Sequence, residues 1–82
     1  MEIWFTYIIE CSDNTFYVGT TNNLEKRMAK HNAGKGAKYT RGRTPVKIRY
    51  MCSFESRAEA CKFKYKLKQY SKKEKIEIIQ KG

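Results

Sequence analysis

The chain has 82 residues, which is enough for one small domain and leaves little material for a second function. Its 18 Lys and Arg outnumber 8 Asp and Glu, and the net charge of +10 makes nucleic acid the first partner to consider. The same charge also fits a merely soluble basic surface, a structural protein of a ribonucleoprotein or an interaction adaptor. Membrane binding is disfavoured, because no basic amphipathic segment has a clean apolar face.

The three cysteines, Cys11, Cys52 and Cys61, form no CxxC pair and have no histidine cluster beside them. They indicate reduced packing thiols of an intracellular protein more than zinc ligands or a disulfide framework. The longest apolar run, residues 3–9, is too short to span a membrane, and no small-residue cleavage site accompanies it. We therefore expect a cytoplasmic protein that does not enter the membrane.

The first part of the chain predicts two paired strands. Residues 4–11 are apolar, aromatic and β-branched, and the turn-forming residues 12–14 follow them. A second, shorter strand is predicted over residues 15–20. Gly19 near its end predicts a place where the backbone bends or lets another group come close.

A helix is predicted next, because Asn22 or Asn23 is suited to cap one. Four residues then recur at the i, i+3, i+4, i+7 spacing of one helical face: Leu24, Arg27, Met28 and His31. Arg27 and His31 are therefore expected to project from the same side, one turn apart.

Residues 32–45 contain three glycines and a proline, which predict a loop instead of a regular helix or central strand. From Ala33 to Met51 there are six Lys or Arg and no acid. Accessible backbone N–H groups, nearby cations and a tyrosine able to stack predict a surface that follows nucleic-acid phosphates. The candidate binding residues are Lys35, Lys38, Tyr39, Arg41 and Arg43. A disordered basic connection is the alternative interpretation.

The remainder predicts a strand and two helices. Residues 46–52 alternate apolar with basic up to Tyr50, as in a strand with one face in the core. Ser56 and Glu59 form a capping-box pattern that opens a helix running to about Tyr70. Its inward stripe is expected to comprise Ala60, Phe63, Leu67 and Tyr70. A second capping box at residues 71–74 starts a short last helix, whose expected apolar contacts are Ile76, Ile78 and Ile79.

These elements predict one α/β domain over residues 1–82. It has a small, mainly antiparallel three-stranded sheet flanked by helices, in the order ββαβαα. The site is expected where the first two strands meet the first two helices.

The segments Phe5-Thr6-Tyr7 and Tyr17-Val18-Gly19, followed by a helix with Arg27 and His31, resemble the signature of the GIY-YIG nuclease family. The resemblance extends over nearly the whole chain, through residues 34–41 and the helix of Glu59. It is strongest to the small, single-domain bacterial branch, which is similar to the catalytic module of structure-specific endonucleases.

The resemblance implies that Tyr17 takes a proton from the attacking water and that Tyr7 positions this water or shares the role. A phenol serves as a base only beside a cation, and Arg27 and His31 can supply that charge or pass the proton on. Arg27 is expected to clamp the scissile phosphate, because a guanidinium forks onto two oxygens. Taken singly, each tyrosine also fits a strand core, and His31 also fits an ordinary helix C-terminus.

The resemblance also implies that Glu59 holds a metal ion, Mg²⁺ or alternatively Mn²⁺. Mg²⁺ needs only one or two protein carboxylates beside the substrate phosphate. Glu59 alternatively accepts the cap N–H of its own helix, and one side chain does not easily hold both roles. The chain departs from the family pattern at two positions. Thr20 stands where several members carry Lys, which removes one phosphate contact, and Ser71 stands where some carry Asn, which leaves a smaller set of ligands.

The function expected from these residues is metal-dependent endonucleolytic hydrolysis of DNA, selected by structure and linked to repair or recombination. DNA is preferred to RNA as the expected partner, and a protein partner is a possible source of further specificity. The alternative is a nucleic-acid-binding accessory module that keeps the fold without cleaving. A domain this small has little room to recognise base edges.

Overall fold

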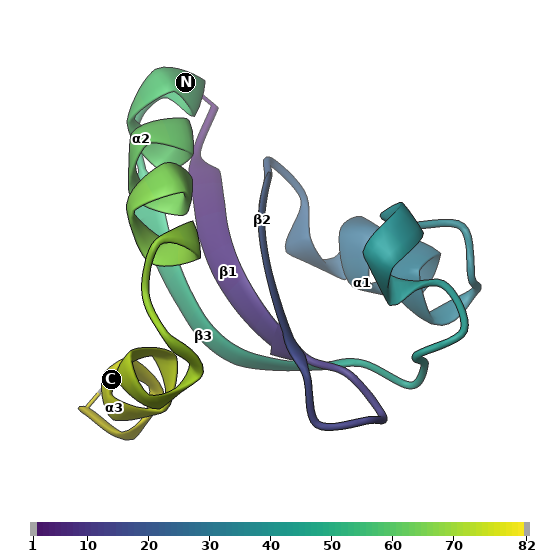
Figure 1. The fold of residues 1–82 in the computed structure, drawn as a ribbon. Coiled ribbons are helices and arrows are strands. Elements are labelled where there is room, and N and C mark those ends of the chain that lie inside the picture. Colours follow the sequence, from purple (N-terminus) through teal and green to yellow (C-terminus); the bar gives the residue numbers. More distant parts are fainter. Residues whose placement is uncertain (1, 82) are drawn as a thin grey trace.

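The computed structural model describes residues 2–81 and confirms the order ββαβαα. The strands and helices are β1 (Trp4–Glu10), β2 (Phe16–Thr21), α1 (Leu24–Asn32), the 3-10 helix η1 (Lys38–Thr40), β3 (Lys47–Phe54), α2 (Arg57–Lys68) and α3 (Lys72–Lys81). Helix α1 and η1 cover one side of the sheet, and α2 and α3 lie on the other (Figure 1). The fold class predicted from the sequence is thus confirmed.

The sheet is antiparallel, with the order β2-β1-β3, so β1 is central. Successive strand residues point to opposite faces. Tyr7, Ile9 and Cys11 therefore face α1, where Leu24 and Met28 pack against them. Between them, Ile8 points to the other face and packs in a second core. The chain thus buries two small cores, one on each side of a single sheet.

Helix α1 begins as predicted, and Asn23 is its cap. The Asn23 side-chain oxygen accepts a hydrogen bond from the Lys26 N–H at 3.0 Å. The far end of α1 is held by Asn32, whose side-chain oxygen accepts from the Val46 N–H at 2.7 Å. The first bond closes the start of the helix, and the second ties its far end to the residue before β3, which helps to fix the direction of the inward face.

The alternation predicted for β3 is interrupted by a bulge. Ile8 pairs with Tyr50 while Ile9 pairs with Ile48, so Arg49 is an extra residue in β3. Ile48 and Tyr50 therefore lie on opposite faces, although an uninterrupted strand would place them together. Tyr50 packs in the second core, whereas Ile48 remains 39% exposed. The prediction of one inward face through Tyr50 is wrong for this reason.

The second core is closed by α2 and α3. Ala60 and Leu67 are fully buried, and Phe63 and Tyr70 also turn inward, although α2 itself ends at Lys68. Three isoleucines of α3 were expected to pack, and two of them, Ile78 and Ile79, do so. The third, Ile76, is 36% exposed, so its predicted contact is wrong.

Cys11 is buried, Cys52 and Cys61 are half-buried, and all three are free thiols. Over residues 2–81, the helices are all too short or too polar to cross a bilayer.

Candidate active site

Tyr7 of β1 and His31 of α1 form the centre of the site. Both side chains are fully buried, and the Tyr7 hydroxyl lies 3.1 Å from His31 Nε2. Glycines make room for each ring. A Cβ on Gly19, which pairs with Tyr7 across β1 and β2, would lie 2.7 Å from Tyr7 Cζ. A Cβ on Gly36 would lie 2.8 Å from His31 Cγ. Close approach is thus the reason for Gly19, one of the two roles predicted for it.

The hydrogen bonds around His31 determine its tautomer. The Thr40 hydroxyl donates its single proton to the Ala37 carbonyl at 2.9 Å, so it can only accept from His31 Nδ1 at 2.8 Å. Nδ1 therefore carries the proton. In a neutral ring, Nε2 is then an acceptor, and Tyr7 donates to it.

The charge states of this pair follow from burial. Burial lowers the pKa of His31, and the positive charge of Arg27 lowers it further. Burial raises the pKa of the Tyr7 hydroxyl, and the hydrogen bond from Arg27 offsets this only in part. Both groups are therefore neutral near pH 7. Tyr7 is a donor to His31 and is not poised to become a phenolate.

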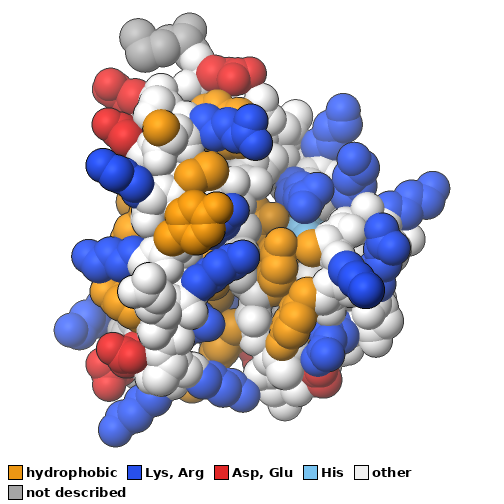
Figure 2. All heavy atoms as spheres, turned by 45° about the horizontal axis from the view of Figure 1, so that its top comes forward, with side chains coloured by type: hydrophobic (Ala, Val, Ile, Leu, Met, Phe, Trp, Pro, Cys, Tyr) orange, Lys and Arg blue, Asp and Glu red, His pale blue; other side chains and the backbone are white. Residues whose placement is uncertain are grey.

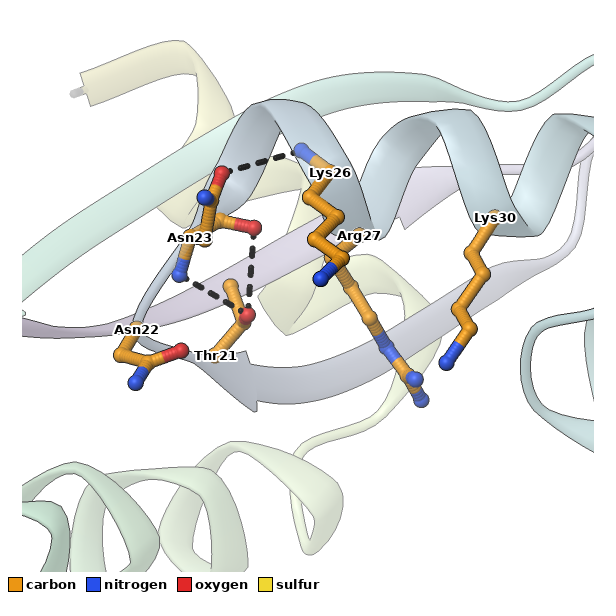
Figure 3. A pocket seen from close by; sticks show the side chains of 6 residues that line it. All are labelled: Thr21, Asn22, Asn23, Lys26, Arg27 and Lys30. Carbon is orange, nitrogen blue, oxygen red and sulfur yellow. Dashed lines mark hydrogen bonds between the residues drawn. The ribbon is translucent and has the colours of Figure 1, made fainter.

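Arg27 connects the buried pair to the surface. Its Nε donates a long hydrogen bond of 3.5 Å to the Tyr7 hydroxyl, while its two terminal nitrogens extend into a pocket of about 230 Å³. Figure 3 shows Arg27 between Lys26 and Lys30, all three reaching from α1 toward the same space. Residues 21–23 complete the wall. Within residues 2–81, none of these three cations forms an ion pair, so the pocket is suited to an anion.

Tyr17 lies on β2 at the border of this group. Its ring packs edge-on against His31 with centroids 5.8 Å apart, and stacks on Tyr39 at 5.9 Å with an interplanar angle of 22°. The Arg43 guanidinium lies 4.4 Å from the centre of the Tyr39 ring and pairs with Asp13. A column of rings therefore runs from buried His31 to the surface, and Tyr17 is half-buried within it.

The predicted basic loop is ordered by two anchors. Thr40 is fully buried against His31, and Arg43 is held between Asp13 and Tyr39. The segment includes the short helix η1, which the glycines and proline did not predict. The other predicted binding residues, Lys35, Lys38 and Arg41, are exposed. Figure 2 shows Lys and Arg spread widely over the visible face, with acidic side chains toward its margins.

Glu59 lies in the first turn of α2, a helix that packs on the other face of the sheet from Tyr7 and His31. Thr6, next to Tyr7, donates to the Ala60 carbonyl at 2.7 Å, which places α2 on the opposite face of the sheet from His31. Glu59 uses only its backbone N–H in the cap, donating to Ser56 Oγ at 3.2 Å. In the second capping box the carboxylate takes part as well, because Glu74 accepts from the Ser71 N–H at 2.8 Å.

The residues around Tyr7 do not form a metal site of their own. Across residues 2–81, no three His, Cys, Asp or Glu side chains gather to hold an ion. The exposed Glu59 carboxylate, free of its cap, retains the chemistry of a Mg²⁺ ligand. Because its helix packs on the other face of the sheet from Tyr7 and His31, the role of Glu59 as a metal ligand stays a prediction.

Two parts of the site had no role assigned from the sequence. Thr40 fixes the His31 tautomer, and Gly36 makes room for the imidazole. Both lie in the glycine-rich segment after α1. Glycine and threonine are common in loops, so their presence there does not by itself predict a contact with a helix.

The chain belongs to the GIY-YIG family: the GIY-YIG catalytic domain matches residues 3–77. Among small proteins of this family, the UPF0213 protein VNG_2274C of Halobacterium salinarum is 55% identical over 69 residues, covering 84% of this chain and 90% of that protein. A UPF0213 protein of Bacillus cereus is 49% identical over 76 residues, covering 93% and 79%.

Solved structures agree with this assignment. The solution NMR structure of the UPF0213 protein BH0048 from Bacillus halodurans has a TM-score of 0.61 and 38% identity, covering 95% of this chain and 83% of that chain. The solution NMR structure of EF2693 from E. faecalis has a TM-score of 0.65 and 36% identity, covering 99% and 90%. Membership of the family, predicted from the tyrosine motifs, is confirmed.

Proposed function

We propose that this protein is an endonuclease that hydrolyses phosphodiester bonds of DNA, selects its substrate by structure, and acts in repair or recombination. The observation that carries the proposal is the position of Arg27, which lines a cationic pocket and also bonds to Tyr7 beside His31. A scissile phosphate bound in this pocket would lie next to the buried Tyr7 and His31 pair. Its developing negative charge would meet a guanidinium already held in place.

The buried residues would act through Arg27 in this mechanism. Tyr7 and His31 are fully buried, so they serve as positioning residues that fix the Arg27 guanidinium. Tyr17 is half-buried and flanks His31, so it is the tyrosine able to contact an attacking water. A phenol base requires a nearby cation, and in this proposal Arg27, which bonds to Tyr7, would supply it.

We retain Mg²⁺, with Mn²⁺ as the substitute, as the proposed cofactor and Glu59 as its ligand. A hard cation would neutralise charge on the phosphoryl oxygens and lower the pKa of a bound water. Support comes from the exposed Glu59 carboxylate, which its own helix cap leaves unused.

Single-turnover cleavage tests this function. Labelled flap, fork, four-way-junction and plain duplex DNA are incubated with the protein in Mg²⁺, Mn²⁺ or EDTA. Tyr17→Phe, Arg27→Ala and Glu59→Gln are compared with Glu74→Gln, whose carboxylate is used by a helix cap. Metal-dependent cleavage of branched DNA that the first three variants lose and the control keeps supports the proposal. Absence of wild-type cleavage on every substrate contradicts it.

A second candidate is nucleic-acid binding without cleavage. It is favoured by one observation: within residues 2–81 no carboxylate bonds to Tyr7, His31 or Arg27, and the helix that carries Glu59 packs on the other face of the sheet. Salt-sensitive binding that survives Glu59→Gln, together with no wild-type cleavage, would establish this function. A protein adaptor, in contrast, would not lose affinity steeply as salt rises.

A further inference from the structure

A second pocket, of about 210 Å³, lies at the start of β2, whereas the pocket of Arg27 lies at the end of this strand. Its wall is formed by Thr15 and Phe16 at the start of β2, Tyr39 of η1, and Lys72 and Lys75 of α3. Three segments far apart in the sequence thus meet at one edge of the sheet, since β2 is an outer strand. The pocket is smaller than the roughly 300–1,000 Å³ of sites for drug-sized molecules, so it suits one flat ring.

The lining combines aromatic rings with cations and includes no acid. Tyr39 is 40% exposed but already contacts Tyr17 and Arg43, so its ring is largely occupied. Phe16 is half-buried, and the Lys72 ammonium lies over its ring at 5.7 Å. Within residues 2–81, neither Lys72 nor Lys75 forms an ion pair. An aromatic ring beside such lysines is the combination by which proteins hold unpaired nucleotides.

We propose that this pocket binds the base of an unpaired nucleotide, stacked on Phe16 in the place that the flexible Lys72 side chain now covers, while the displaced Lys72 and Lys75 bind the adjoining phosphates. A base inside a duplex is stacked and paired, so it cannot enter such a pocket without first leaving the helix. The inference rests on the proposed function and adds its substrate class, DNA with a single-stranded portion. The column from Tyr39 through Tyr17 to His31 connects this pocket with the site of Arg27.

The stacking interaction is tested by binding alone, in EDTA, so that cleavage does not intervene. Fluorescence anisotropy compares three labelled DNAs: a blunt duplex, the same duplex with a short single-stranded extension, and that extension with its bases removed. The base of the extension is expected to strengthen wild-type binding about tenfold, the scale of one base stacked on an aromatic ring. The abasic extension should lose this tenfold and keep only the smaller gain that comes from its phosphates.

Two variants and their matched controls locate the pocket. Phe16→Leu and the double variant Lys72→Gln/Lys75→Gln should lose the gain and keep the affinity for blunt duplex. Tyr65→Leu, at a tyrosine 61% exposed on α2, and Lys73→Gln/Lys81→Gln should keep the gain. Phe16 packs against the second core, so Phe16→Leu could destabilise the fold. The lysine double variant does not change the core and therefore tests the pocket in that case as well.

Different failures have different meanings. If the abasic extension binds as tightly as the intact one, or if the gain survives the lysine double variant, the base pocket is refuted. If blunt duplex binds with a steep salt dependence but the extension adds nothing, this inference fails and the proposed function stands. If the wild type binds none of the three DNAs, both fail.

Discussion

Gly19 and Tyr7 face each other across the β1 and β2 ladder, and the glycine has no side chain because the tyrosine ring occupies that space. The ring is held in this position, since it is fully buried and its hydroxyl contacts both His31 and Arg27. The glycine of the second tyrosine motif is therefore needed for packing of the first motif. The two motifs form one structural unit.

We expect Gly19→Ala to lower the free energy of unfolding by about 1–3 kcal/mol, the usual cost of overfilling a packed core. Urea denaturation followed by circular dichroism measures it. Thr20→Ala, at the half-buried next residue, is the control and should change little. A variant Gly19→Ala as stable as the wild type would show that Tyr7 can move aside.

The Thr40 hydroxyl should matter as an acceptor for His31 Nδ1. Thr40→Val keeps the shape and removes the hydroxyl, leaving a buried N–H unpaired, so we expect a loss of about 1–3 kcal/mol in unfolding free energy. Thr40→Ser restores the hydroxyl and should recover most of the loss. Equal losses in both variants would assign the effect to the missing methyl group instead of the hydrogen bond.

These residues also show where sequence reasoning succeeds and where it stops. The order of the elements and the inward face of α1 follow from local periodicity and caps, such as Asn23 accepting from Lys26. The bond between His31 and Thr40 joins a helix to a glycine-rich loop, and its geometry depends on packing around Gly36. The extra residue Arg49 in β3 is likewise decided by pairing with β1, so alternation alone predicted the wrong face.

Stability should fall as the pH is lowered through the range in which unfolded histidine gains a proton. The pKa of His31 is depressed in the folded protein, so below about pH 6.5 the unfolded chain binds a proton that the native state does not. The unfolding free energy should therefore decrease from pH 7.5 to pH 5.5, by at most about 1.4 kcal/mol per pH unit for one proton. Urea titrations at both pH values measure it.

His31→Gln is the control for this pH effect, and it should flatten the dependence although it lowers stability at both pH values. Asp13, whose pKa is lowered chiefly by its hydrogen bond from Thr15, titrates in a more acidic range and does not interfere. An unchanged slope in His31→Gln would assign the effect to other groups.

Arg27→Lys separates charge from geometry. Lysine keeps the positive charge in the pocket but loses the forked guanidinium and the Nε donor to Tyr7. We expect the single-turnover cleavage rate to fall about 10²-fold, the scale of one lost transition-state donor, while DNA affinity changes little. Cleavage at the wild-type rate would show that neither the forked guanidinium nor the bond of Nε to Tyr7 is needed for cleavage.

The lysines of the Arg27 pocket should be visible in the salt dependence of DNA binding. If Lys26 and Lys30 each neutralise one phosphate, Lys26→Gln/Lys30→Gln should reduce the slope of log affinity against log salt by about 1.8, at about 0.9 per contact in duplex DNA. Lys73→Gln/Lys81→Gln removes the same charge from α3, outside both pockets. If phosphates bind specifically at Lys26 and Lys30, only the variant of these two lysines should lower the slope. An equal reduction in both double variants would mean that DNA is attracted by net charge alone.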